Sequence, residues 1–118
     1  MPKASYKIEL DIFSGMPNPS FEITREDFAA LCEEVTALEN AEPALLFDGL
    51  GFRGIIVSGP ISTFLCIQNK IIKLEILNSI KYFTSNVDII LKAINLFKKY
   101  DKAGNYTTLA DEAFRQYF

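Results

Sequence analysis

The chain has 118 residues, of which 49% are hydrophobic, and its 12 basic and 15 acidic side chains give a formal net charge of −3. This length and apolar content predict one globular domain, residues 1–118, with a core of its own. The N-terminal segment holds no uninterrupted apolar stretch and no later run approaches membrane-spanning length, so we expect a soluble, cytoplasmic protein with no membrane partner.

Charge is unevenly spread along the chain. Residues 1–59 carry four basic and ten acidic side chains, a net charge of −6, whereas residues 60–118 carry eight basic and five acidic ones, a net charge of +3. Either each half has simply acquired its own solvated surface, or the molecule is dipolar, with an acidic face for a basic partner or for head-to-tail self-association. Basic residues alternate with aromatic ones in the second half, but the acidic first half repels phosphate, so no nucleic-acid partner is expected.

Cys32 and Cys66 are the two cysteines, and histidine is absent. Two cysteines are too few for a disulfide framework, and no Cys-x-x-Cys spacing or histidine indicates a structural zinc site. We therefore expect two small core residues, with no metal and no cofactor. The sequence leaves open whether the two cysteines are ever paired.

The first predicted element is a strand over residues 6–12, where apolar and polar residues alternate and Asp11 falls on the wet face. The stretch 12–20, Ile-Phe-Ser-Gly-Met-Pro-Asn-Pro-Ser, follows it. Its two prolines fix φ and Gly15 accepts a positive φ, so a rigid turn is expected. Residues 20–23 then form a short extended piece.

A helix is predicted to start near Arg25, because Thr24 followed by Asp27 resembles a capping box. Its apolar residues recur at three- and four-residue spacing and leave an acidic opposite face: Phe28, Leu31, Cys32, Val35 and Leu38. Residues 39–52 are irregular, with Pro43 and two glycines around an apolar plug, Leu45-Leu46-Phe47.

Residues 53–59 form a β-branched run that suits a strand buried on both faces near the middle of a sheet. Residues 63–76 are typical of a hairpin whose turn is Asn69-Lys70, since Asn tolerates the positive φ of a primed turn. No element is assigned to residues 77–84.

A second helix is predicted over residues 86–100, opened by Ser85 with Asp88 three residues later. Its apolar arc is too wide for one contact, so it needs the sheet and a second surface. The second surface is either a final helix, opened by Thr108 with Asp111, or a partner chain in a homo-oligomer.

Together these elements predict an α+β fold with two layers, in which three helices pack on a small mixed sheet of about four to five strands. Ser14-Gly15 and Ser58-Gly59 both end strands and are followed by proline. If the two strands are neighbours joined through the first helix, the crossover rule makes them parallel, and both turns fall at one sheet edge. Such an edge often holds ligands. The candidate binding residues are Asp11, Ser14, Gly15, Asn18, Ser58 and Gly59.

Each of these residues also has a purely structural interpretation. The serines either donate to an anion or peptide carbonyl, or belong to ordinary turn chemistry. Asn18 either recognises a ligand or bonds its own backbone, and Asp11 is either a base or ion ligand, or solvated. Arg53 is expected to pair with Asp48. No phosphate loop, nucleophile elbow or dinucleotide fingerprint is present, and no catalytic residue is identified.

The Ser-Gly-Met-Pro-Asn-Pro turn at 14–19 and the Leu-Gly-Phe-Arg-Gly segment at 50–54 resemble a family of small, functionally uncharacterised bacterial proteins. These proteins carry a Ser-Gly-x-Pro-Asn-Pro turn and a Leu-Gly-(aromatic)-Arg-Gly segment. The resemblance covers about the first half of the chain and implies that the turn matters. It implies no activity or ligand.

Two functional hypotheses follow. The favoured one is a non-catalytic binding module for a protein or peptide partner, such as an inhibitor, immunity factor or accessory subunit. The alternative is a small enzyme or small-molecule carrier whose two Ser-Gly turns cradle an anionic group. General acid-base catalysis without histidine needs a carboxylate in an apolar setting, and none is evident in the sequence.

Overall fold

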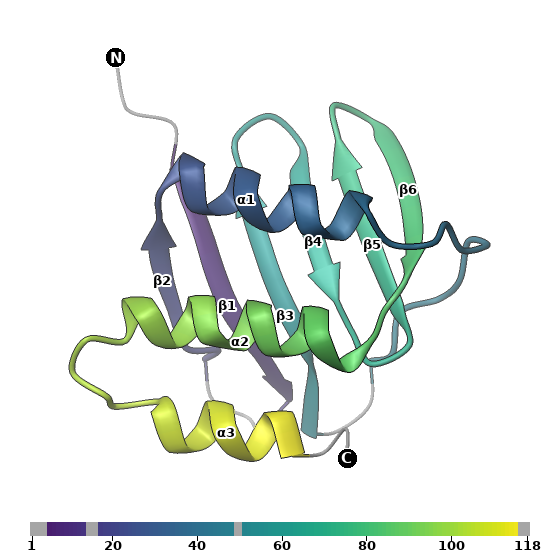
Figure 1. Ribbon diagram of the computed structural model, residues 1–118. Coiled ribbons are helices and arrows are strands. Elements are labelled where there is room, and N and C mark those ends of the chain that lie inside the picture. Colours follow the sequence, from purple (N-terminus) through teal and green to yellow (C-terminus); the bar gives the residue numbers. More distant parts are fainter. Residues whose placement is uncertain (1–4, 14–16, 49–50, 116–118) are drawn as a thin grey trace.

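The computed structural model describes residues 5–13, 17–48 and 51–115, which form six strands and three helices. Figure 1 shows their arrangement. In chain order they are β1 (Tyr6–Phe13), β2 (Ser20–Ile23), α1 (Arg25–Thr36), β3 (Gly51–Gly59), β4 (Thr63–Ile67), β5 (Ile71–Ile76), β6 (Ser79–Thr84), α2 (Val87–Tyr100) and α3 (Thr107–Arg115). The three helices lie on one face of the sheet, so the predicted two-layer α+β architecture is confirmed.

The sheet itself differs from the prediction in size and strand direction. Its order is β2-β1-β3-β4-β5-β6, and every neighbouring pair is antiparallel. The expectation of a mixed sheet with four to five strands is therefore wrong.

No described helix is both long and apolar enough to cross a bilayer.

The strands around Ile8 and Ile56 are neighbours, as expected, but they run antiparallel, with Ile8 opposite Val57. The crossover rule does not apply because residues 20–23 pair with β1 and return the chain to the end where β1 began. α1 then crosses the sheet towards β6, and the chain passes round that edge before it enters β3 (Figure 1).

A β-bulge marks the pairing of β1 with β3. Asp11 lies opposite Gly54 and Ile12 opposite Phe52, so Arg53 is the extra residue. Gly54 has a φ of 148°, and a Cβ there would lie 2.6 Å from the carbonyl oxygen of Ile67. A residue without a side chain is therefore required for β4 to approach the bulge.

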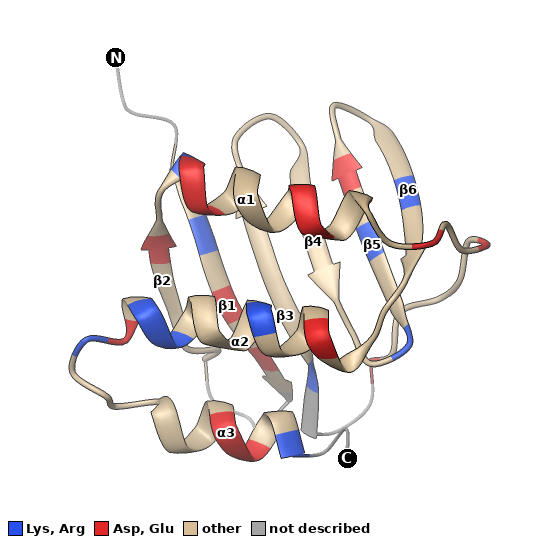
Figure 2. Ribbon diagram, in the orientation of Figure 1, with Lys and Arg blue, Asp and Glu red and all other residues tan. Residues whose placement is uncertain are grey.

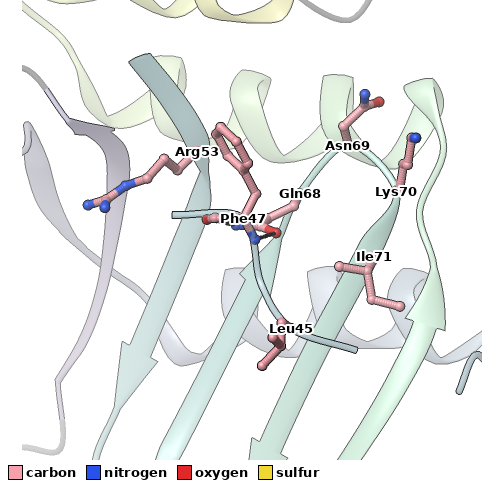
Figure 3. A pocket seen from close by; sticks show the side chains of 7 residues that line it. All are labelled: Leu45, Phe47, Arg53, Gln68, Asn69, Lys70 and Ile71. Carbon is pink, nitrogen blue, oxygen red and sulfur yellow. Dashed lines mark hydrogen bonds between the residues drawn. The ribbon is translucent and has the colours of Figure 1, made fainter. Parts of the chain in front are cut away.

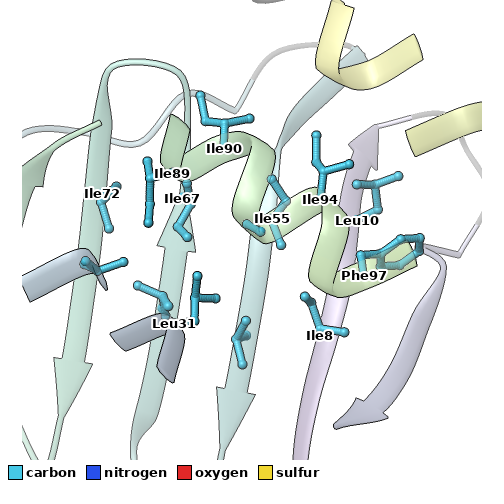
Figure 4. Close-up of a cluster of buried hydrophobic side chains, with 14 of the residues drawn as sticks. Ile8, Leu10, Leu31, Ile55, Ile67, Ile72, Ile89, Ile90, Ile94 and Phe97 are labelled. Carbon is cyan, nitrogen blue, oxygen red and sulfur yellow. The ribbon is translucent and has the colours of Figure 1, made fainter. Parts of the chain in front are cut away.

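The core lies between the sheet and the helices (Figure 4). Alternate residues of β1 and β3 point towards the helices, and Ile8, Leu10 and Ile55 have no exposed surface. α2 contributes Ile90 and Phe97, also fully buried. Burial on both faces of β3 is not found, because its outward residue Ile56 is only half-buried.

Several local signals are confirmed and others shift by a residue. Thr24 caps α1 by accepting a hydrogen bond from the N–H of Asp27. α2 is capped by Asn86 rather than Ser85, because the Asn86 Oδ1 accepts from the N–H of Ile89 at 2.9 Å. α3 begins at Thr107, one residue before the expected cap at Thr108.

The hairpin β4–β5 is confirmed, but its Asn69-Lys70 turn has no positive φ. The primed geometry occurs instead at Leu77-Asn78, with φ of 49° and 69°, between β5 and β6. The unassigned segment 77–84 is therefore the second half of a hairpin.

α2 lies between α1 and α3, so the final helix supplies the second surface that its wide apolar arc needs (Figure 1). The charges of the two halves of the chain meet here (Figure 2). Lys99 pairs with Asp27 and Lys92 with Glu34, both across the α1–α2 contact. The opposite net charges of the two halves are thus partly neutralised within the molecule.

Candidate functional site

One face of the sheet is covered by none of the three described helices, and a long connection crosses it. Residues 41–48, which we call the strap, leave the β6 edge and pass over the helix-free face to reach β3 (Figures 1 and 3). The strap starts where the N–H of Ala41 donates to the carbonyl oxygen of Tyr82 at 2.9 Å.

The side chain of Gln68 holds the far part of the strap. Its Oε1 accepts from the N–H of Phe47, and its Nε2 donates to the carbonyl oxygen of the same residue, both at 2.8 Å. Gln68 is only 5% exposed. One buried amide therefore satisfies both backbone groups of Phe47, as a neighbouring strand would.

A cavity of about 490 Å³ opens between the strap and the start of β5 (Figure 3). Its lining residues are Leu45, Phe47, Arg53, Gln68, Asn69, Lys70 and Ile71. Two large apolar side chains of the strap are exposed at its rim, Leu45 at 98% and Phe47 at 57%. Exposed apolar side chains beside a hollow are typical of interaction sites.

A polar network lies beside the cavity on the same face. Asp11 Oδ1 accepts from Arg53 Nη2 at 2.8 Å and from Asn18 Nδ2 at 3.2 Å. Asn18 Nδ2 also donates to Glu9 Oε2 at 2.8 Å, and Arg53 Nη1 reaches the carbonyl oxygen of Asp48 at 3.4 Å. The bulge thus directs the Arg53 side chain to Asp11. The expected contact of Arg53 with Asp48 is a hydrogen bond to the carbonyl oxygen of Asp48.

The described residues of the predicted site fall into two groups. Asp11 and Asn18 lie together and are engaged with each other. Ser58 lies opposite Lys7 at the start of β1, several residues along that strand from Asp11. Because β1 and β3 are antiparallel, the expectation that they run parallel is wrong, and with it the argument from strand direction that placed both Ser-Gly turns at one edge.

Ser14 and Gly15 lie outside the described residues. Gly59 has a packing role, because a Cβ there would lie 2.6 Å from the ring of Tyr6. Asp11 is 9% exposed, so it is not the solvated side chain that the alternation suggested. Its partner Arg53 is 42 residues away in sequence, and no local pattern identifies such a pair.

A second cavity, of about 640 Å³, adjoins the Pro17-Asn18-Pro19 turn. Its other lining residues come from β1, β2, the residue before α3 and α3 itself: Ile12, Ser20, Phe21, Tyr106 and Leu109. Among the described residues, no charged side chain lines it. The Asn18 amide at its wall is already hydrogen-bonded to Ile12, Glu9 and Asp11.

The two cysteines lie on opposite sides of the sheet and both are free. Cys32 packs on the core from α1, whereas Cys66 alternates with the core residues Leu65 and Ile67 and so faces the helix-free side. Burial raises the pKa of the Cys32 thiol to about 11 and that of the Cys66 thiol to about 12. Both thiols are therefore protonated at neutral pH.

Within the described ranges 5–13, 17–48 and 51–115, no group of three or more Cys, Asp or Glu side chains is placed to hold a metal ion. Comparison with protein-family models, curated proteins and solved structures found no match for this chain.

Proposed function

We propose that this protein is a non-catalytic binding module that recognises a protein or peptide partner at the cavity beneath the strap. The observation that carries the proposal is the pair of exposed side chains at its rim, Leu45 and Phe47. Burying an exposed apolar side chain in a complex contributes about 25 cal/mol of binding free energy per Å² of apolar surface removed from water.

The held strap supports this function because it presents those side chains in a fixed position. Gln68 fixes the backbone of Phe47, so less conformational freedom is lost when a partner binds. A cytoplasmic location and the absence of nucleic-acid and membrane partners remain part of the proposal, as the sequence predicted.

The alternative, an enzyme or carrier with an anion site at the two Ser-Gly turns, loses its geometric argument. Ser58 and Asp11 do not lie at a common strand end. Asp11 accepts from Arg53 and Asn18, an arrangement that stabilises the sheet without any ligand.

Selection of displayed random peptides on the immobilised full chain tests the proposal. Enriched peptides are expected to lose at least about tenfold in affinity for Leu45→Asp, as at interface hot spots. The matched control is Ile61→Asp, since Ile61 is 76% exposed on the β3–β4 turn and lines none of the cavities described here. Peptides that bind Leu45→Asp and Ile61→Asp equally well would contradict the proposal.

A further inference from the structure

The charged side chains that line the cavity beneath the strap are both basic. They are Arg53 and Lys70, and among the described residues no acidic side chain lines this cavity. The strap carboxylates of Glu42 and Asp48 lie outside the lining. A partner that enters the cavity therefore meets positive charge, which a carboxylate of the partner would compensate.

Lys70 carries the positive charge that the chain itself does not balance. The guanidinium of Arg53 donates to Asp11 at 2.8 Å, and Figure 3 shows it pointing away from the other lining side chains. Lys70 is exposed, and within the described ranges it forms no salt bridge. A negative group of the partner is therefore expected at Lys70, at the β4–β5 turn.

Asn69 adds a second hydrogen-bond donor beside Lys70. Both residues are exposed, and Figure 3 shows the polar ends of their side chains pointing to the same side. The amide of Gln68, by contrast, is already hydrogen-bonded to the backbone of Phe47. The amide and the ammonium of the turn together suit a carboxylate, because both groups donate and a carboxylate accepts.

An apolar wall lies next to these donors. Leu45, Phe47 and Ile71 line the same cavity, and Ile71 directly follows Lys70 in the chain. The occupant that matches this lining has an apolar group for the wall and a carboxylate for the turn. A peptide has both groups where an Asp or Glu residue stands beside a bulky apolar one.

We infer that the partner at this cavity is a peptide segment in which a single acidic side chain stands beside a bulky apolar one. The inference rests on the proposed function and names the chemistry of its partner. The apolar side chain packs against the wall, and the carboxylate binds Lys70 and Asn69. A long acidic run is disfavoured, because Glu42 and Asp48 are exposed on the strap and would repel it.

The sequences of random displayed peptides selected on the immobilised full chain test the inference. Enriched peptides are expected to contain Asp or Glu beside a bulky apolar residue such as Leu, Ile or Phe. The chain has a net charge of −3, so non-specific attraction enriches basic peptides. An enrichment of acidic peptides would therefore have a local cause on the surface of the chain.

A charge exchange identifies the contact itself. Lys70→Glu is expected to weaken a selected peptide, synthesised with both termini blocked, roughly tenfold. Replacing the acidic residue of that peptide by Lys is expected to restore its binding to Lys70→Glu. Fluorescence anisotropy measures each affinity, and unfolding curves check that Lys70→Glu is folded, which its exposure predicts.

The matched control for this exchange is Lys102→Glu, which changes the net charge equally. Lys102 is exposed between α2 and α3 and lines none of the cavities described here. Lys102→Glu is expected to leave the affinity for the acidic peptide nearly unchanged. A peptide that both substitutions weaken equally would overturn the inference, because the net charge alone would then explain its binding.

The outcomes separate this inference from the proposed function. Selected peptides that need Leu45 but contain no acidic residue overturn the inference and leave the binding module intact. A chain that selects no Leu45-dependent peptide overturns both. Acidic peptides whose affinity is unchanged by Lys70→Glu overturn the inference, because their carboxylate then binds elsewhere.

Discussion

Asn18 closes the connection between β1 and β2 by accepting a hydrogen bond from the backbone of Ile12, with its Oδ1 2.9 Å from the nitrogen. The same side chain donates to Glu9 and Asp11 on the strand it closes. The Pro-Asn-Pro turn is thus fixed at both of its prolines and at the side chain between them.

The first prediction concerns this amide. Asn18→Ala is expected to lower the free energy of unfolding by about 1–2 kcal/mol, because the N–H of Ile12 loses its acceptor. Asn18→Asp is expected to cost more, since it adds a third carboxylate beside Glu9 and Asp11. Urea unfolding at neutral pH measures both. Asn69→Ala is the control, because Asn69 is exposed, and a loss as small as this control's would refute the role of Asn18.

The second prediction compares two glycines with positive φ. Gly54→Ala is expected to cost about 3 kcal/mol, because the new Cβ would lie 2.6 Å from the backbone of Ile67 in a strained conformation. Gly104 has a φ of 73°, and a Cβ added there would meet no atom within 4 Å beyond its chain neighbours, so Gly104→Ala is expected to cost about 1 kcal/mol. Urea unfolding of both variants tests whether Gly54→Ala lowers the free energy of unfolding more than Gly104→Ala does. Equal losses would show that the close approach of β4 is unimportant.

The third prediction is a gain in stability. Ile61 has a φ of 54°, a conformation that β-branched residues resist, and it is 76% exposed. Ile61→Asn is expected to raise the free energy of unfolding by about 0.5–1 kcal/mol, because Asn accepts this region and little buried surface is lost. Thermal unfolding is the measurement. The control is Ile80→Asn, at an exposed position in β6, which is expected to bring no gain in stability. An Ile61→Asn variant no more stable than the wild type would show that the strain at Ile61 is absent.

The fourth prediction concerns pH. The Tyr100 hydroxyl, hydrogen-bonded to Asp27, and then Lys99 lower the pKa of that carboxyl below its ordinary 3.8. A lowered pKa in the folded state stabilises the fold above pH 3.8, and this contribution is lost as the pH falls through the folded-state pKa. Tyr100→Phe is therefore expected to cost about 1 kcal/mol at neutral pH and less in acid.

Urea unfolding of wild type and Tyr100→Phe at pH 7 and below pH 3.8 measures that change. Some loss is expected to persist in acid, because the Tyr100 hydroxyl also accepts from the N–H of Thr24 at 3.0 Å. A difference that grows as the pH falls would contradict the assignment to Asp27.

Local signals in the sequence predicted most of the elements. The cap at Thr24, the alternation from Tyr6 to Ile12 and the apolar arc of residues 86–100 each depend on near neighbours, and each gave an element close to the observed one. β6 was not predicted because its turn uses Leu77 at a positive φ, where glycine is the usual signal.

The direction of β3 and the candidate site depend on contacts between distant residues. The sequence predicts only a short extended piece at residues 20–23, yet their pairing with β1 decides which way β3 runs. The cavity depends on Gln68 binding the backbone of Phe47, 21 residues away, and no periodicity encodes that contact. Among the four residues of the predicted site that the structure describes, Asp11 and Asn18 lie together.

Residues 39–41, which lead into the strap, also cover the edge of the sheet at β6. Asn40 bridges to Phe83, Ala41 donates to Tyr82 and Thr84 donates to Glu39, so the chain itself covers half of β6. An uncovered strand at this position would offer a template on which other chains add in register. Substitutions that detach residues 39–41 are therefore expected to expose the backbone groups of Tyr82–Thr84 and to favour association of chains edge to edge.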